Sequence, residues 1–169
     1  MGGALMIILA LVVIAAVMSI AYYNTFVRLR NQTDEAFSTM DVYLKKRYDL
    51  IPNLVETVKH YAIHEKETLE KVISARTMAM GSQSIDERVQ NENMLSGTLK
   101  SLFAVSESYP DLKADTSFLN LQNQLSSIEN EISQARKYYN GAVRALNTKI
   151  EMFPSNIVAN MAGFKKYPF

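Results

Sequence analysis

The chain has 169 residues, with 18 basic and 17 acidic side chains and a formal net charge of +1. This balance argues against nucleic-acid binding, for which a strongly basic surface is expected. The sequence holds no cysteine, which excludes disulfides and thiol acylation, so that the fold must be held by packing.

An uncharged apolar run opens the sequence, and the first charged side chain is Arg28. The apolar core of this run is Leu5–Ala21, with Ile14 near its middle. A helix of about 20 apolar residues crosses the ~30 Å hydrocarbon core of a bilayer. Two tyrosines follow the run, where they can lie at the headgroup boundary. We therefore predict a transmembrane anchor over residues 1–23 and the lipid bilayer as a partner.

A cleaved secretory signal peptide is the alternative interpretation of this run. Such a peptide has a basic start, a shorter apolar core and a small-residue cleavage site. Here Met1–Ala4 contains no Lys or Arg, and the run ends in Tyr22, Tyr23 and Asn24. The pattern therefore favours an uncut membrane helix.

The basic residues that follow the span predict its orientation. Arg28 and Arg30 come first, and the run Lys45–Arg47 comes later. Because Lys and Arg close to a membrane helix tend to stay in the cytoplasm, we expect a single-pass protein with its N-terminus outside and its domain inside. The run Lys45–Arg47 itself is more typical of a solvated face than of a lipid-binding site.

The remainder of the sequence is typical of an all-α protein. Apolar and small residues recur at alternating spacings of three and four from Phe118 to Phe153, which is the seam of a helical bundle. The predicted helices cover residues 24–50, 53–80, 85–108 and 115–153.

Breakers separate these helices. We expect a helix boundary or sharp kink at Pro52, since proline lacks an N–H and restricts the preceding residue. Gly81 and Tyr109–Asp111 mark the next two turns, and Pro154 ends the last helix. Because short connections make neighbouring helices antiparallel, residues 24–153 are predicted to form an up-and-down four-helix bundle.

A tail over residues 154–169 remains, and it allows two interpretations. Its aromatic residues can lie over the bundle, or the peptide around Lys165 and Lys166 can contact anionic lipid or a partner. We favour the first.

The histidines are the first candidates for chemistry. His60 and His64 are four residues apart, which would place them on one face of a helix beside Glu56 and Glu67. A catalytic zinc site needs a third protein ligand, and the position at which a zinc peptidase has its second histidine is Thr68. We therefore predict no metal site, no cofactor and no catalytic residue.

Several polar residues fall close to the apolar stripes. We expect some of them to form charge pairs between helices, which fix register more than they add stability. A polar patch that binds a ligand is the alternative. These residues are Arg47, Asp49, Asn53, Glu65, Arg76, Asn93, Glu129 and Arg136.

Motifs spread over nearly the whole chain carry a family resemblance. They include YNTFVRLRN from Tyr23, EAFSTMDVYLKKRYDLIPN from Glu35, LVETVKHYAIHEKETLEKVISAR from Leu54, LFAVSESYPDL from Leu102, ARKYYNGA from Ala135 and FPSNI from Phe153. This ordered set resembles the LemA family of bacterial membrane-anchored helical proteins. The resemblance implies a single span in the bacterial cytoplasmic membrane, with the N-terminus outside, and a long helical bundle. It brings no established catalytic residue.

The leading functional hypothesis is a non-enzymatic scaffold that self-associates at the membrane. Small residues in the span, Ala10, Ala15, Ala16 and Ser19, permit close helix approach and are the candidate oligomer contacts. The first alternative is an adaptor or regulator of a membrane protease or signalling system, with other membrane proteins as partners. The weaker alternative is a metal-dependent enzyme.

Overall fold

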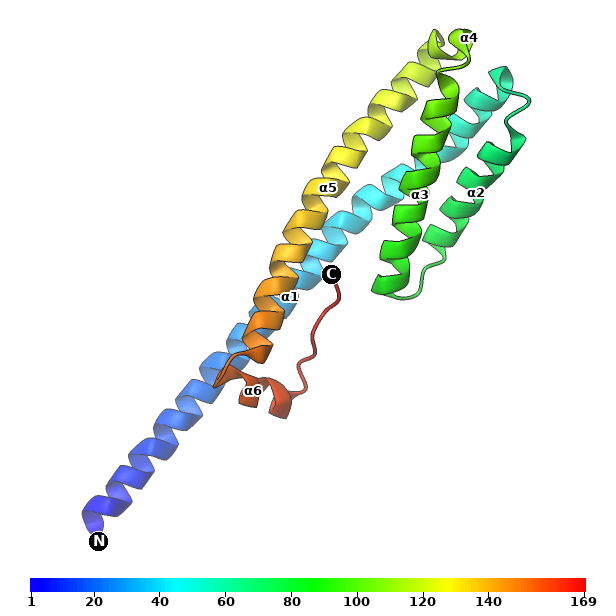
Figure 1. Cartoon of the computed structure of the whole chain (residues 1–169). Helices are drawn as coiled ribbons and strands as arrows, with labels where there is room; N and C mark the ends of the chain where they lie inside the picture. Colours follow the sequence, from blue (N-terminus) through cyan, green and yellow to red (C-terminus); the bar gives the residue numbers. More distant parts are fainter. The chain divides into compact units, whose positions relative to one another are not determined.

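The computed structural model describes residues 1–169 as an all-α protein with six helices and no strand (Figure 1). The helices are α1 (Gly2–Tyr61), α2 (Lys66–Met80), α3 (Ile85–Ser106), α4 (Pro110–Lys113), α5 (Thr116–Glu151) and α6 (Ser155–Ala162).

Two compact units divide the chain. Unit 1 comprises residues 1–39 and 135–169, and unit 2 comprises residues 40–134. The long helices α1 and α5 each contribute residues to both units, and α2, α3 and α4 belong to unit 2.

The helix boundary that we expect at Pro52 lies elsewhere, because α1 continues through Pro52 to Tyr61. Proline has no N–H, so the carbonyl of Tyr48, four residues earlier, lacks its usual helical donor. The Nε of Arg76 on α2 donates a 2.8 Å hydrogen bond to this carbonyl instead. A donor from a neighbouring helix thus satisfies the acceptor that proline leaves open, and the first break falls at residues 62–65.

Side chains cap two of the helices that follow, α3 and α5. The Ser84 hydroxyl accepts a 3.1 Å hydrogen bond from the backbone N–H of Glu87 at the start of α3. At the start of α5, the Asp115 carboxylate accepts a 3.0 Å hydrogen bond from the N–H of Phe118. Both caps satisfy N–H groups that have no partner within their own helix.

The core of unit 2 is apolar and is contributed by α1, α2, α3 and α5, with Leu112 of α4 also fully buried. Its most deeply buried members include Leu44, Ile51, Leu54, Val58, Val72, Leu95, Leu102, Phe118 and Leu125. These residues recur at helical spacing, so each helix turns one stripe inward.

Unit 1 has two small clusters of buried residues. One brings Phe26 of α1 against Leu146 and Ile150 of α5 and Ala159 of α6. The other consists of Ala36, Tyr139 and Val143.

Phe153 departs from the predicted seam. Because α5 ends at Glu151, Phe153 no longer follows the helical spacing, and 78% of its surface is exposed. Of the residues of unit 1 that precede it on the seam, Tyr139, Leu146 and Ile150 are buried, whereas Ala135 and Ala142 are half-buried.

Candidate functional site

The first half of α1 presents an exposed apolar surface. Its most apolar 18-residue stretch has no buried residue, and α1 is the one helix that is long and apolar enough to cross a membrane. Leu5 and Ile14 are both exposed over more than half of their surface. The one hydroxyl within this run, that of Ser19, donates a 2.8 Å hydrogen bond to the Ala15 carbonyl of its own helix. The segment therefore offers lipid a continuous apolar face with its polar group satisfied internally.

A buried arginine lies in the second half of α1. Arg47 is only 1% exposed, so it does not belong to the solvated face that we expect over Lys45–Arg47. It lies three residues after Leu44 and four before Ile51, both of which are buried. Arg47 thus occupies the inward stripe of the helix, whereas Lys45 and Lys46 are exposed.

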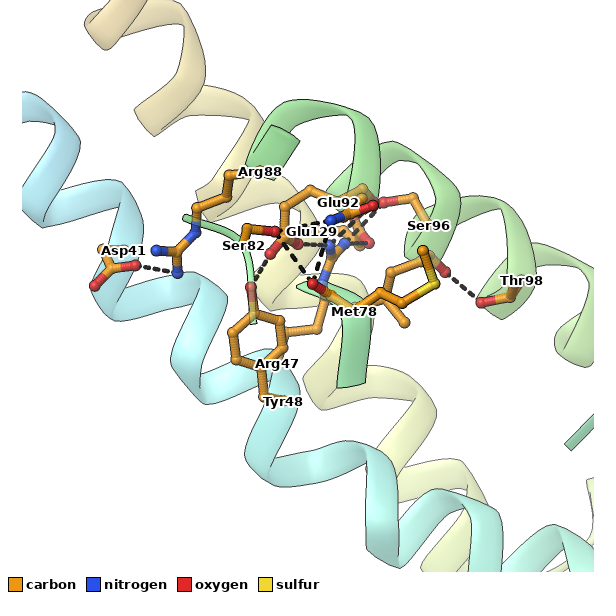
Figure 2. Close-up of polar contacts among 12 residues, drawn as sticks. Asp41, Arg47, Tyr48, Met78, Ser82, Arg88, Glu92, Ser96, Thr98 and Glu129 are labelled. Carbon is orange, nitrogen blue, oxygen red and sulfur yellow. Dashed lines mark hydrogen bonds and ion pairs between the residues drawn. The ribbon is translucent and has the colours of Figure 1, made fainter. Parts of the chain in front are cut away.

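Two helices, α3 and α5, supply the partners of the Arg47 guanidinium (Figure 2). Its Nη2 pairs with the carboxylate of Glu92 on α3, and its Nη1 pairs with the carboxylate of Glu129 on α5. The same Nη1 donates a 2.8 Å hydrogen bond to the Oγ of Ser96. Glu92 also accepts a hydrogen bond from the hydroxyl of Tyr48. We call Arg47, Tyr48, Glu92, Ser96 and Glu129 the Arg47 network.

The two carboxylates of the Arg47 network have different environments. The Glu92 side chain is 2% exposed, whereas that of Glu129 is 43% exposed. The Glu92 carboxylate therefore loses its hydration on burial, and the hydrogen bonds from Arg47 and Tyr48 compensate for this loss. The Glu129 carboxylate keeps much of its contact with water.

The chemistry of the Arg47 network favours a structural role. Guanidinium stays protonated in proteins and only donates hydrogen bonds, so Arg47 cannot exchange protons with a substrate. The planar guanidinium of Arg47 on α1 contacts two side chains of α3 and one of α5, and so links α1 to both helices. Buried polar groups with such fixed geometry can specify which residues face each other between helices.

Two further polar contacts flank the Arg47 network. Arg88 of α3 pairs with Asp41 of α1 (Figure 2). The Asn91 amide nitrogen donates to the Met78 carbonyl at 3.2 Å and to the Ser82 hydroxyl at 2.9 Å, which ties α2 to α3 across their connection.

Six of the eight sequence-predicted polar residues separate into two groups, those with contacts to another segment and those that are exposed. Arg47 and Glu129 form a charge pair between helices as predicted. Arg76 instead donates to the backbone carbonyl of Tyr48, and Glu65 accepts a 3.0 Å hydrogen bond from the hydroxyl of Tyr109. Asp49 and Asn53 are exposed.

Glu92 was not among the predicted polar residues, although its spacing contains a signal. It lies three residues before Leu95 and seven before Leu99, on the buried stripe of α3. An acidic residue on an apolar stripe requires a partner, and the basic residue on a facing stripe is Arg47.

The histidines do not share a helical face. His60 is in the last turn of α1, whereas His64 lies in the connection over residues 62–65, because the helix ends at Tyr61. No group of three or more His, Asp or Glu side chains is placed to hold a metal ion.

The tail folds back on the helices of unit 1, as the favoured interpretation predicts. The Tyr167 hydroxyl donates to Asp34 at 2.7 Å, and the Tyr167 N–H and carbonyl both bond to the Asn147 side chain at 2.9 Å. Burial and the hydrogen bond to Asp34 raise the pKa of Tyr167 to about 12.

The attachment of the tail should weaken at high pH. The folded-state pKa of Tyr167 lies above the ordinary value of 10.0. The protonated Tyr167 hydroxyl therefore contributes its full stabilisation of the folded state below pH 10, and this stabilisation is lost as the pH rises through about 12. We expect the melting temperature in detergent to fall more for the wild type than for Tyr167→Phe between pH 10 and 12. Thermal unfolding followed by circular dichroism measures this difference. Because the two proteins share all other tyrosines, an equal fall in melting temperature in both would contradict the prediction.

Comparison with known proteins identifies the family. The model of the LemA family matches residues 36–169. The chain belongs to the LemA family. This membership agrees with the motifs in the sequence and with the all-α architecture.

The relatives of this LemA-family chain carry two kinds of name. Magnetosome protein MamQ 2 of Paramagnetospirillum magneticum is 24% identical over 96% of the chain and 70% of its own length. Protein LemA of Metamycoplasma hominis is 28% identical over 80% of the chain and 63% of its own length. Magnetosome protein MamQ of Magnetospirillum gryphiswaldense is 21% identical over 87% of the chain and 64% of its own length. The chain thus spans about two thirds of each relative.

Proposed function

We propose that this LemA-family protein is a membrane-anchored scaffold without catalytic activity of its own, which associates with copies of itself. The observation that carries the proposal is the exposed apolar surface of α1 over Leu5–Ala21. This surface is continuous with the helix that supplies core residues such as Phe26 to unit 1 and Leu44 to unit 2. An anchor joined to the domain without a linker would hold the domain at the bilayer surface.

The contacts within unit 2 support a rigid helical domain. The Arg47 network joins α1 to α3 and α5, and Arg76 joins α2 to α1. The short connections at residues 62–65 and 81–84 agree with an antiparallel bundle, which we include in the proposal for this unit.

Small residues in the span are the proposed contacts between copies. Ala15 and Ser19 are one helical turn apart, and Ala16 lies beside them, so together they form a small-residue face that lets two helices approach closely. Ala10, the fourth candidate, lies five residues before Ala15 and therefore on the other side of the helix, so it is not part of this face.

Substitution of this face should dissociate the assembly. We expect Ala15→Leu/Ser19→Leu to shift the protein toward the monomer, because two larger side chains keep the helices apart. Val13→Leu/Val17→Leu, on the opposite face, is the matched control and should leave the assembly intact. The measurement is the mass of the full chain extracted with its lipid in mild detergent.

The same experiment separates the alternatives. A wild-type protein that is monomeric at micromolar concentration would contradict the scaffold. Crosslinking in cells through Lys45, Lys46, Lys165 and Lys166 that recovers only other proteins would instead favour an adaptor of a membrane protease or signalling system.

The orientation of the proposed anchor can be tested because the chain has no cysteine. The basic side chains of Arg28 and Arg30 follow the span, so we propose that the N-terminus is outside and the domain lies in the cytoplasm. We expect Lys66→Cys, an exposed position on α2, to react with a membrane-impermeant maleimide only after cells are permeabilised. Labelling of intact cells would place the domain outside, and recovery of the protein in the aqueous fraction would contradict the anchor.

A further inference from the structure

An apolar stripe remains exposed at the junction of α5 and α6. Ile157 and Met161 are four residues apart on α6 and are 51% and 85% exposed, and Phe153, just before the helix, is 78% exposed. Met152 beside them is also exposed. The opposite side of α6 is packed, because Ala159 is fully buried against Phe26 and its cluster. The helix therefore has one face in the core of unit 1 and one large apolar face with no protein partner.

This stripe lies beside the end of the apolar span. Ser19, Ile20 and Tyr23 of α1 line one shallow groove together with Val158, Met161 and Ala162 of α6. Figure 1 shows α6 lying next to α1 within unit 1, at the end of α5. Met161 thus lies at the level of Ile20, where the helix leaves the hydrocarbon core if residues 5–21 span it.

The turn after α6 is fixed by glycine and by an aromatic contact. Gly163 has a φ of +77°, a conformation that other residues rarely adopt. The chain reverses there, so that Phe164 stacks on Phe26 with the ring centroids 5.1 Å apart. This closure holds α6 against α1 and keeps its apolar stripe outward.

The segments that carry the stripe and the end of the span are rich in basic residues. Residues 22–30 and 149–166 contain five basic side chains but only one carboxylate, that of Glu151, which pairs with Lys166. The Lys149 ammonium lies 5.3 Å from the centre of the Tyr22 ring, at the end of the span. The Arg30 guanidinium lies 5.3 Å from the centre of the Phe164 ring. An apolar face with basic residues beside it is the pattern of an interfacial membrane helix.

We propose that α6 is a second membrane contact, whose stripe of Phe153, Ile157 and Met161 enters the headgroup and acyl-chain boundary of the leaflet from which α1 emerges. The occupant of this face is lipid because Met161 of the stripe lines a groove together with Ser19 and Ile20 of the span itself. Lys149 and Lys165 face anionic headgroups in this arrangement. The inference rests on the proposed membrane anchoring of α1. The second contact would hold unit 1 in a fixed orientation on the membrane surface.

Single tryptophans can test this contact because the chain contains none. Phe153→Trp supplies a stripe probe, Ile14→Trp a span probe and Tyr138→Trp an α5 probe, each in the full chain. Tyr138 is an exposed aromatic residue in unit 1, and about 16 Å of α5 separates it from Lys149. Each protein is reconstituted in vesicles of phosphatidylcholine and phosphatidylglycerol whose acyl chains are brominated near the headgroup or near the terminal methyl.

We expect the stripe probe to be quenched more by bromines near the headgroup than by terminal ones, which corresponds to a depth of about 5–10 Å. The span probe should be quenched most by terminal bromines, and the α5 probe should be quenched by neither. Adding Ile157→Asn and Met161→Asn should lower the quenching of the stripe probe roughly twofold or more, because the stripe loses its apolar area.

The pattern of quenching distinguishes failure of the proposed anchor from failure of the proposed contact through α6. If the span probe is quenched and the stripe probe is not, the anchor stands and the contact through α6 is overturned. If neither probe is quenched, the anchor is overturned and the contact through α6 with it. Quenching of the α5 probe equal to that of the stripe probe also overturns the contact, since the signal would then not be specific to α6.

Discussion

Replacement of Arg47 by methionine should destabilise the protein by about 3–5 kcal/mol, because it leaves the carboxylate of Glu92 buried without its cation. Arg47 is 1% exposed and the Glu92 side chain is 2% exposed, so water cannot replace the lost partner without opening the core. The measurement is urea unfolding of the full chain in mild detergent, followed by circular dichroism.

The triple variant Arg47→Met/Tyr48→Phe/Glu92→Leu tests the cause of this loss. It removes the buried cation, its buried carboxylate and the hydroxyl that donates to that carboxylate, so no group of the pair stays unsatisfied. Because apolar replacement of a whole buried ion pair is often neutral or stabilising, we expect this variant to regain most of the wild-type stability. Glu129 needs no replacement, since 43% of its side chain is exposed and water can solvate it.

Lys45→Met is the matched control for Arg47→Met. Lys45 is two residues away on the same helix and also pairs with a carboxylate, that of Asp41, but its side chain is 69% exposed. Its loss should cost no more than about 0.5 kcal/mol, as for most exposed ion pairs. Equal effects of the two substitutions would show that burial of Arg47 does not determine its contribution.

The features that could be predicted from the sequence are those encoded by local spacing. The apolar run Leu5–Ala21 and the seam that begins at Phe118 each repeat one signal over many residues, so the span and the long last helix follow from pattern alone. The tendency of polar residues near a stripe, such as Arg47, to pair between helices also follows from the high cost of burying an isolated charge.

The features that could not be predicted depend on contacts between distant residues or on where a helix ends. Glu92 lies 45 residues from Arg47, and nothing local selects it as the partner. The exposure of Phe153 depends on the end of α5 falling two residues before it. At Pro52, the donor to the open Tyr48 carbonyl is Arg76, which lies on another helix.

This compensation at Pro52 leads to the second large prediction, that Arg76→Leu destabilises the protein by about 1–3 kcal/mol. The guanidinium of Arg76 donates to the Tyr48 carbonyl, which has no helical donor because residue 52 is proline. Its removal leaves a buried backbone acceptor unsatisfied, since Tyr48 is 3% exposed. Urea unfolding of the full chain in mild detergent again measures the loss.

Pro52→Ala should reduce the cost of losing Arg76. Alanine at this position has an N–H that can donate to the Tyr48 carbonyl within α1, so the carbonyl keeps a donor when Arg76 is replaced. We therefore expect Arg76→Leu to cost about 1 kcal/mol less in the Pro52→Ala background than in the wild type, a coupling typical of residues that share one acceptor. Pro52→Ala alone should stabilise the protein, because proline inside a helix is unfavourable.

Lys71→Leu supplies the control for this cycle. Lys71 is also on α2 but pairs with Glu67 of its own helix, so its replacement should have the same small effect in both backgrounds. If Arg76→Leu costs as much with alanine at position 52 as with proline, Arg76 contributes through contacts other than the Tyr48 carbonyl. In that case the continuity of α1 through Pro52 would have to come from the packing of Ile51 and Leu54, both of which are fully buried.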